Sequence, residues 1–248
     1  MRRVHSMIRK NPAAACLSAL IFALAAGACG REAPADKDVD TGYGYTAEEF
    51  DQIARDVFAP IYPYLARQVR DDYKITSGVA VDAGSGPGYW SIELAKATDL
   101  RVYALDLDPE AVKIVRRNIK SAGLEGRVEA VEGNVQKMPF KDDFADLVIS
   151  RGSYPFWKDK VAAFKEILRI LKPGGVAYVG GGLGSLIPDE ERTRIRDIMD
   201  ARKIGPPAAL EVSFEDMSRI LREAGIPEFR ISPDAGCLCG LWVEFKKK

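Results

Sequence analysis

A short apolar run followed by three closely spaced glycines constrains this chain more than any other feature. Residues 79–81 are Val-Ala-Val, and Asp82 and the loop Ala-Gly-Ser-Gly-Pro-Gly over residues 83–88 follow them. Apolar residues at helical spacing occupy 89–96, and a second apolar run over 102–105 ends at Asp106. A buried parallel strand, a tight turn and a helix explain the pattern, which predicts a nucleoside-binding unit of an α/β fold.

The spacing of the glycines limits which class of ligand this loop can bind. Gly84, Gly86 and Gly88 lack Cβ atoms where the chain turns, so we expect their N–H groups to face a ligand carboxylate or phosphate before a helix N-terminus. Tyr89 stands where the dinucleotide fingerprint has its third glycine, which counts against NAD or FAD. Asp106 is expected to accept hydrogen bonds from both hydroxyl groups of a ribose. A plain tight turn and a solvated helix cap are the simpler alternatives.

These residues resemble the first two motifs of the class I S-adenosylmethionine-dependent methyltransferases, close to the branch with the ubiquinone and menaquinone C-methyltransferases. Three further segments match in the family's order, at residues 132–140, 144–151 and 168–175. The resemblance covers about residues 78–245. It implies a Rossmann-like α/β fold with a seven-stranded, mostly parallel sheet, an antiparallel last strand and helices on both faces. It also implies S-adenosylmethionine as cofactor and methyl transfer to a small-molecule acceptor.

The resemblance assigns cofactor contacts to the matching positions. Asp82 and the glycine loop would contact the methionine part, and Leu107 would pack on the adenine. Asn134 stands where the family more often has Asp, and its side-chain oxygen still accepts a hydrogen bond from the adenine amino group. The implied cofactor-binding residues are Asp82, Gly84, Ser85, Gly86, Gly88, Asp106, Leu107, Asn134, Val135 and Ser150.

Acceptor contacts are expected from segments that cover the same edge of the sheet. A lid helix over residues 46–72, with Thr46 as its N-cap, resembles the helix that closes the site in related proteins. Arg151 either binds an acidic substrate through a bidentate pair or is a surface arginine paired with Asp159. The aromatic residues after it either form a wall for a flat acceptor or pack at the base of a loop. The substrate-binding candidates are Tyr43, Tyr45, Arg151, Tyr154, Trp157 and Cys237.

The catalytic assignment stays open because the sulfonium of the cofactor is already a strong methyl donor and needs no dedicated base. Tyr154 and Arg151 are the catalytic candidates, and Asp82 is a further possible base that we expect to hydrogen-bond the glycine loop or the cofactor amine instead. The single histidine is His5, so we predict no histidine base and no metal site in the domain.

The last two strands are expected at residues 229–232 and 241–245, with the loop between them at the cofactor edge. Cys237 and Cys239 follow this loop and could line the acceptor side. The simpler interpretation makes them small buried residues of a strand, and the alternative is soft-ligand chemistry on a thiol or a metalloid such as arsenite.

The N-terminal segment has the pattern of a signal peptide. Basic residues at positions 2, 3, 9 and 10 precede an uncharged stretch over 11–30 that is rich in Ala and Leu. Residues 25–29, Ala-Ala-Gly-Ala-Cys, resemble a bacterial lipobox, which implies lipidation of Cys29. We therefore predict a lipoprotein-type signal peptide over 1–29, a flexible tether over 30–44 and a methyltransferase domain over 45–248.

This leader predicts a membrane-associated bacterial lipoprotein, with three alternatives. Ordinary secretory cleavage and an uncleaved anchor are two of them, and a cytoplasmic protein with a start codon assigned too far upstream is the third. An exported methyltransferase would also need a supply of S-adenosylmethionine, which is made in the cytosol.

The balance and distribution of charged residues limit the classes of partner that we expect. The chain has 36 Lys and Arg against 36 Asp and Glu, and no basic stripe interleaved with aromatic residues, so nucleic acid is an unfavoured substrate. The expected partners are a small-molecule acceptor and, through the leader alone, a membrane; the sequence leaves the oligomeric state open. The alternative function is a non-catalytic nucleoside-binding or envelope lipoprotein with the same fold, and the glycine spacing disfavours a nucleotide-sugar or NAD enzyme.

Overall fold

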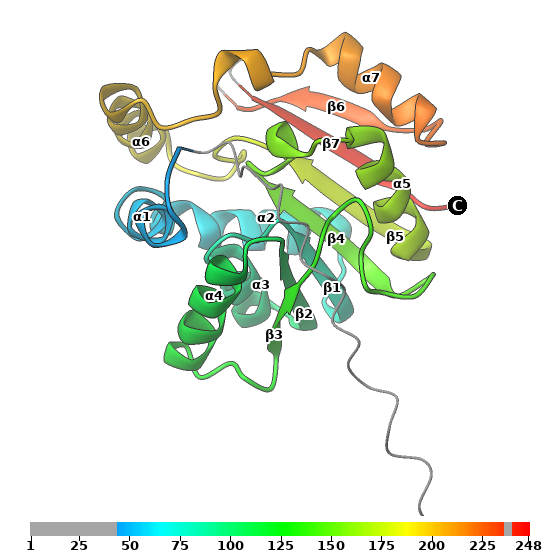
Figure 1. Cartoon of the computed structure of the whole chain (residues 1–248), viewed down its shortest axis with the longest axis horizontal. Helices are drawn as coiled ribbons and strands as arrows, with labels where there is room; N and C mark the ends of the chain where they lie inside the picture. The colour runs from blue at the N-terminus through cyan, green and yellow to red at the C-terminus, as the bar shows by residue number, and fades with distance from the viewer. Residues whose placement is uncertain (1–43, 236–239) are drawn as a thin grey trace, which may run out of the picture. The chain divides into compact units, whose positions relative to one another are not determined.

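The structure, a computed structural model, describes residues 44–235 and 240–248 (Figure 1). The predicted signal peptide, Cys29, Tyr43, Cys237 and Cys239 lie outside the described residues, so the predictions on them stay predictions. The chain divides into two units, Met1–Lys37 and Asp38–Lys248, and the description below concerns the second. Over the described ranges, none of the helices is both long and apolar enough to cross a bilayer.

The described strands form one seven-stranded sheet with the order β3-β2-β1-β4-β5-β7-β6. Neighbours from β3 to β5 pair in parallel, and β7 pairs antiparallel with both β5 and β6. This topology confirms the predicted Rossmann-like sheet with an antiparallel last strand. The strands are β1 (Ser77–Ala83), β2 (Asp99–Asp106), β3 (Val128–Glu132), β4 (Ala145–Arg151), β5 (Leu171–Gly180), β6 (Arg230–Pro233) and β7 (Leu241–Lys246).

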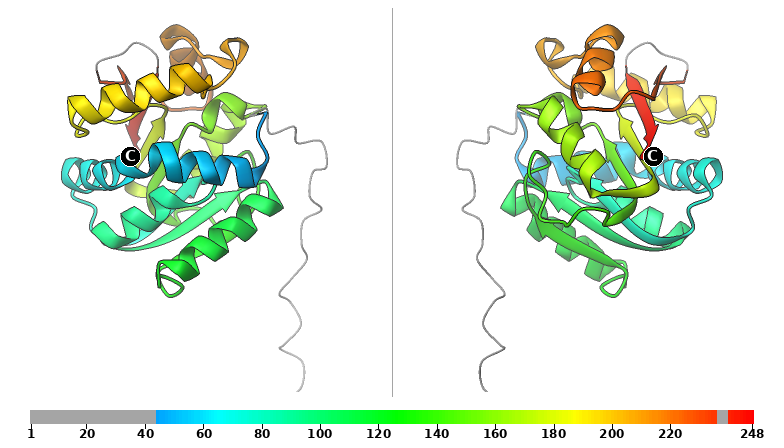
Figure 2. Two further views of the ribbon diagram at one scale, coloured as in Figure 1. Left: turned by 90° about the vertical axis from the view of Figure 1, so that its left-hand side faces the viewer. Right: turned by 90° about the vertical axis from the view of Figure 1, so that its right-hand side faces the viewer.

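Helices cover both faces of the sheet (Figures 1 and 2). Each connection between parallel strands contains a helix or a long loop, as parallel pairing requires. The α-helices are α1 (Ala47–Ile53), α2 (Tyr62–Tyr73), α3 (Tyr89–Ala97), α4 (Pro109–Ser121), α5 (Lys160–Ile170), α6 (Asp189–Arg202) and α7 (Phe214–Glu223). Shorter turns are the π-helical η1 (Ala54–Phe58) and the 3-10 segments η2 (Ala59–Ile61), η3 (Tyr154–Phe156) and η4 (Ala208–Leu210).

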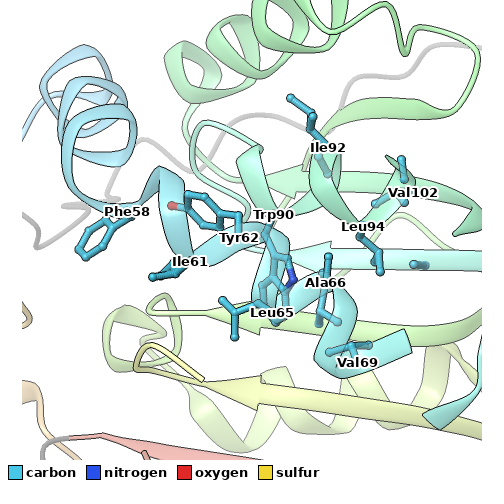
Figure 3. Close-up of a cluster of buried hydrophobic side chains, with 14 of the residues drawn as sticks. Phe58, Ile61, Tyr62, Leu65, Ala66, Val69, Trp90, Ile92, Leu94 and Val102 are labelled. Atoms are coloured by element: carbon cyan, nitrogen blue, oxygen red, sulfur yellow. The ribbon is translucent and has the colours of Figure 1, made fainter. Parts of the chain in front are cut away.

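The core has two layers because successive strand residues point to opposite faces of the sheet. Leu147 and Ile149 of β4 belong to a buried cluster with α2, α3 and α6, whereas Val148 belongs to a cluster with α5 and α7. In the first layer, Leu65 and Ala66 of α2 pack toward Trp90 of α3 (Figure 3). Apolar burial on both faces explains the long apolar runs of the central strands β1 and β4, whereas the edge strands β3 and β6 are more polar and more exposed.

The predicted lid helix over 46–72 is not continuous. Thr46 caps α1 as expected, with the reciprocal capping box to Glu49. After Ile53 the chain passes through η1 and η2 before α2 begins at Tyr62. Pro60 lies in η2 and Pro63 in the first turn of α2, and each lacks the N–H that a continuous helix would use, so the prolines favour a break there. The break separates α1 from α2.

Candidate active site

The carboxyl ends of the parallel strands place the predicted polar residues along one edge of the sheet. Asp82 lies near the end of β1, Asp106 ends β2, and Ser150 and Arg151 end β4. In the sheet register Ala83 pairs with Leu105, and Arg151 pairs with Gly180 at the end of β5. Ligands of open parallel sheets bind at this edge, where the strand order reverses between β1 and β4.

The glycine loop is held from below by β2. Gly84 N–H and Ser85 N–H both donate to the Leu105 carbonyl at 2.9 Å, and Gly86 N–H donates to Asp106 Oδ2 at 2.7 Å. A Cβ at Gly84, whose φ is +76°, would lie 2.6 Å from Ser153 Oγ, so this position requires glycine. The Gly88 N–H donates to the Ser85 carbonyl at 3.0 Å. The expectation that the N–H groups of Gly84, Gly86 and Gly88 face a ligand anion is therefore wrong, because protein oxygens accept all three hydrogen bonds.

Asp106 and Asp82 lie in environments that favour their protonated forms. Burial raises the pKa of Asp106 to about 6, against the opposing effect of hydrogen bonds from the Asp108 and Gly86 N–H groups. Burial and, to a smaller extent, the nearby Asp106 carboxylate together raise the pKa of Asp82 to about 7, against the opposing effect of hydrogen bonds from Ser91. Asp82 accepts a hydrogen bond from Ser91 Oγ of α3, at 2.7 Å, rather than from the glycine loop, and the expected alternative, a bond to the cofactor amine, stays a prediction.

The helix α1 covers the glycine loop. A Cβ at Gly86 would lie 3.1 Å from the ring of Phe50, so the ring lies directly against this loop position. One residue later, the buried Asp51 accepts hydrogen bonds from Tyr89 Oη at 3.0 Å, Arg117 Nη2 at 2.7 Å and Asn118 Nδ2 at 3.1 Å. Asp51 therefore ties α1 to both α3 and α4.

Ser150 and Ser153 connect the end of β4 to β1. Ser150 is fully buried and its Oγ lies 2.7 Å from Ser153 Oγ, which donates to the Ala83 carbonyl at 2.9 Å. Ser153 thus supports the strand end immediately before Gly84. Asn134 Oδ1 accepts the Gln136 N–H at 2.8 Å, which forms a local turn after β3 and leaves one acceptor site on the oxygen. Leu107 is half-buried at the end of β2, and Val135 is buried.

The aromatic residues after β4 pack at the base of their loop. Tyr154 and Trp157 are each 6% exposed and belong to the core layer of α5 and α7, and the Trp157 ring lies 5.6 Å from that of Phe164. The alternative that they form an exposed wall for the acceptor is therefore not observed. Burial also raises the pKa of Tyr154 to about 12, which disfavours it as a base near neutral pH. Tyr45, before α1, is half-buried.

Among the described residues Arg151 makes no ion pair with Asp159, and its other expected contact, with an acidic substrate, stays a prediction. Its Nε donates to the Gly182 carbonyl at 2.7 Å, and its guanidinium carbon lies 4.4 Å from the centre of the Phe58 ring. Asp159 instead caps α5 by accepting the Ala162 N–H at 2.9 Å. The predicted ion pair between Arg151 and Asp159 is therefore wrong, because Asp159 serves its own helix.

Comparison with known proteins agrees with this geometry. The model of a family described as a methyltransferase domain matches residues 81–179. An uncharacterized methyltransferase of Bacillus subtilis is 33% identical over 107 residues, which are 42% of this chain and 57% of that protein. A 2-methyl-6-phytyl-1,4-hydroquinone methyltransferase of Oryza sativa is 32% identical over 41% of this chain, and the match spans only 30% of its length.

A solved structure decides the family. A protein of Methanococcus maripaludis, described as a candidate S-adenosyl-L-methionine-dependent methyltransferase, is 38% identical, with a TM-score of 0.72 over 82% of this chain and 92% of that one. The chain belongs to the S-adenosylmethionine-dependent methyltransferases. A ubiquinone/menaquinone biosynthesis C-methyltransferase of Shewanella woodyi is more distant, at 26% identity over 82% of this chain and 87% of its own. S-adenosylmethionine is the cofactor of this enzyme family.

The residues at the sheet edge fit this cofactor. Ser85 Oγ and Trp157 Nε1 are buried polar atoms without a hydrogen-bond partner among the described residues. Both belong to the glycine loop region, since a Cβ at Gly84 would lie 3.9 Å from Trp157 Nε1. Unpaired buried donors and acceptors are costly, so a polar ligand beside the loop would stabilise them. Asp106, at the end of β2, has further oxygen lone pairs for ribose hydroxyl groups.

Sequence reasoning missed Asp51, Ser153 and Asp234 as organising residues. Asp51 lies three and seven residues before Ala54 and Phe58, so a carboxylate stands on the apolar face of its helical segment, and this misplaced charge was an available signal. Ser153 and Asp234 lie in loops without such periodicity. The contacts that join Ser153 to β1 and Asp234 to the loop after β5 span 70 and about 50 residues, and no local pattern indicates them.

Proposed function

We propose that this protein transfers the methyl group of S-adenosylmethionine to a small organic acceptor at the carboxyl edge of the sheet. The observation that carries the proposal is the hydrogen bond from the Gly86 N–H to Asp106 Oδ2, in a loop that lies against the Phe50 ring. Two buried polar atoms of the same loop region, Ser85 Oγ and Trp157 Nε1, have no partner among the described residues. A nucleoside ligand would satisfy these groups. The family relationship supports the choice of nucleoside.

The residues of the chain would act mainly by positioning. The bound cofactor supplies a methyl group already activated on sulfur, so placing an acceptor in line accounts for much of the rate. Asp106 would orient the ribose, and Asn134 would accept a hydrogen bond from the adenine amino group. The helix α1, tied down by Asp51, would exclude water above Gly86.

Calorimetry on the full chain tests the first half of this proposal. We expect micromolar binding of S-adenosylmethionine and S-adenosylhomocysteine, and no binding of NAD, because the glycine spacing does not suit a dinucleotide. Incubation with methyl-labelled cofactor and a small-molecule extract of the source organism tests the second half. Label in a small molecule supports the proposal, and absence of cofactor binding contradicts it in favour of a non-catalytic protein.

We also propose that residues 1–29 are a lipoprotein-type signal peptide and that Cys29 receives the lipid. The basic start, the apolar stretch over 11–30 and the sequence Ala-Ala-Gly-Ala-Cys support this proposal. Labelled palmitate is expected in the wild type and in Cys16→Ser, which removes the other cysteine of the leader. Cys29→Ser is expected to lose the label, and a labelled Cys29→Ser protein would contradict the assignment.

A further inference from the structure

Arg151 is a half-buried arginine held rigidly at the edge of the candidate site. Its Nε–H donates to the Gly182 carbonyl, and its guanidinium lies over the Phe58 ring at 4.4 Å and near the Tyr62 ring at 5.8 Å. Phe58 and Tyr62 come from the segment that joins α1 to α2 and from the start of α2 (Figure 3). These contacts use the Nε edge and one face of the guanidinium. Its two Nη groups have no hydrogen-bond partner among the described residues.

No carboxylate of the described residues lies within ion-pair distance of Arg151, whereas comparable arginines here are paired. Arg117 pairs with Asp51, Arg169 with Glu166 and Asp142, and Arg192 with Asp234. A guanidinium presents its donors in a planar fork that matches a carboxylate, and partial burial without a counter-charge is costly. An anionic ligand would provide the missing partner.

The loop that holds Arg151 is itself fixed by two residues, Asp234 and Gln68. The N–H groups of Leu183 and Gly184 donate to Asp234 Oδ1 at 3.1 and 3.0 Å, and the Ser185 N–H donates to Gln68 Oε1 at 2.8 Å. A Cβ at Gly182 would lie 2.3 Å from the Asp234 carboxyl, so the two segments touch. The Gly182 carbonyl therefore has a defined position, and the Arg151 fork is oriented before any ligand arrives.

The sheet register places Arg151 beside the glycine loop. Arg151 ends β4, and Ile149 of the same strand pairs with Asp82 of β1, directly before the loop. The N–H groups of Gly84, Ser85 and Gly86 have protein acceptors, so they are not free to bind an anion. A carboxylate at this end of the sheet needs another cation, and Arg151 supplies it.

We propose that Arg151 binds a ligand carboxylate at the acceptor side of the site, which makes an anionic small molecule the favoured acceptor. The inference rests on the proposed function. A carboxylate also occurs on the amino-acid part of the cofactor, so the shared chemistry is a carboxylate–guanidinium pair with two possible sources. 5′-Methylthioadenosine lacks that carboxylate and separates them.

The test compares the wild type with Arg151→Gln and Arg151→Lys, with Arg222→Gln as the matched control. Arg222 also stacks on an aromatic ring, that of Phe229 at 5.7 Å, but belongs to α7 rather than to the site. Calorimetry with S-adenosylhomocysteine and 5′-methylthioadenosine reports on the cofactor. Methylation of extract fractions separated on an anion-exchange resin reports on the acceptor.

If the carboxylate belongs to the acceptor, the acceptor is retained by the anion-exchange resin, and Arg151→Gln binds both nucleosides within about twofold of the wild type. The kcat/KM of this variant for the acceptor then falls by about 30-fold, mainly through a higher KM. Arg151→Lys recovers part of the loss because it keeps the charge but not the fork. If the cofactor is the source, Arg151→Gln loses about tenfold or more for S-adenosylhomocysteine only.

Three results would overturn the proposal. An equal loss of affinity for both nucleosides in Arg151→Gln would assign Arg151 a structural role. An acceptor that passes through the resin is uncharged or cationic, and together with unaffected cofactor binding this result would contradict a carboxylate contact. Unchanged kcat/KM and unchanged nucleoside binding in Arg151→Gln would exclude a ligand contact. If the wild type binds neither nucleoside, the proposed function itself fails, and that outcome is distinct from the other three.

Discussion

At the residue scale, Asp82 and Asp106 are carboxyl groups that are partly withdrawn from water in the free protein, where burial disfavours their charged forms. Each is a carboxylate near a strand end, and burial raises the pKa of Asp82 to about 7 and that of Asp106 to about 6. The same burial concentrates the electrostatic effect of a ligand on both groups. Affinity and stability at this edge should therefore depend on pH between about 4 and 7.

Asp106→Ala is the direct test of the ribose contact. We expect the affinity for S-adenosylhomocysteine to fall by about 10- to 100-fold, because a carboxylate that accepts two hydroxyl protons is lost. Calorimetry measures the affinity, and circular dichroism confirms folding. Asp99→Ala removes the acid at the other end of β2, whose side chain is 90% exposed, and should bind as the wild type does. Equal affinity for the wild type and Asp106→Ala would contradict the contact.

Asp82 gives a prediction on stability against pH. Its pKa is 3.8 when unperturbed and about 7 in the fold, so between these values the folded state holds a proton that the unfolded state has released. Stability of the free protein therefore falls as pH rises through this window, by about 2 to 4 kcal/mol from this group. Urea midpoints at pH 5 and 8 measure the change. Asp82→Asn should remove most of the slope, and an unchanged slope would contradict the assignment.

At the scale of the elements, α1 is held over the glycine loop by a single buried carboxylate. Asp51 is fully buried and accepts hydrogen bonds from α3 and α4, while Arg55 of η1 also pairs with it. The arginines that bind Asp51 are themselves more than 40% exposed, which limits the cost of losing the pair. The helix is thus a separable cover whose closure depends on few groups.

Asp51→Ala should loosen this cover without unfolding the sheet. We expect a loss of about 1 to 3 kcal/mol in local stability of residues 47–58, seen as faster hydrogen exchange there, and about tenfold weaker binding of S-adenosylhomocysteine. Asp56→Ala changes an exposed acid of the same segment and serves as the control. Exchange that accelerates equally in both variants would assign no special role to Asp51.

At the scale of the whole domain, Asp234 joins parts that the sheet alone leaves separate. This buried residue after β6 accepts hydrogen bonds from the loop after β5, from Arg196 of α6 at 3.2 Å and from Trp242 of β7 at 3.1 Å. The nearly buried Arg192 lies 3.9 Å from the same carboxylate. The helix α6, which contacts η1 of the cover, is thereby connected to the far edge of the sheet.

Asp234→Ala should destabilise the domain by about 3 to 5 kcal/mol, because it leaves Arg192 and two loop N–H groups buried without their acceptor. Urea unfolding measures the loss. Asp189→Ala removes the exposed acid that lies 3.8 Å from the same arginine and should change stability by less than about 0.5 kcal/mol. Similar losses for the two variants would show that the buried carboxylate has no special weight.

The strand, glycine loop and helix over residues 77–97, and Asp106 at a strand end, were predictable because each depends on side chains close together in sequence. The order of the strands came from the family resemblance rather than from periodicity. The lid was predicted as one helix because its apolar spacing is helical, and its interruption depends on prolines and on packing against the first core layer.

The sequence by itself therefore determined the strand-loop-helix unit and the polar residues at the strand ends, since local hydrophobic period and glycine spacing specify them, and the resemblance of its motifs to a known family implied the cofactor. Only the tertiary structure decided how these residues are partnered. Arg151 donates to the carbonyl of residue 182 rather than to Asp159, and Tyr154 and Trp157 are buried. The N–H groups of residues 84–86 donate to acceptors of β2. Such contacts join residues far apart in the chain, where many polar side chains are chemically eligible and only proximity in the fold selects among them.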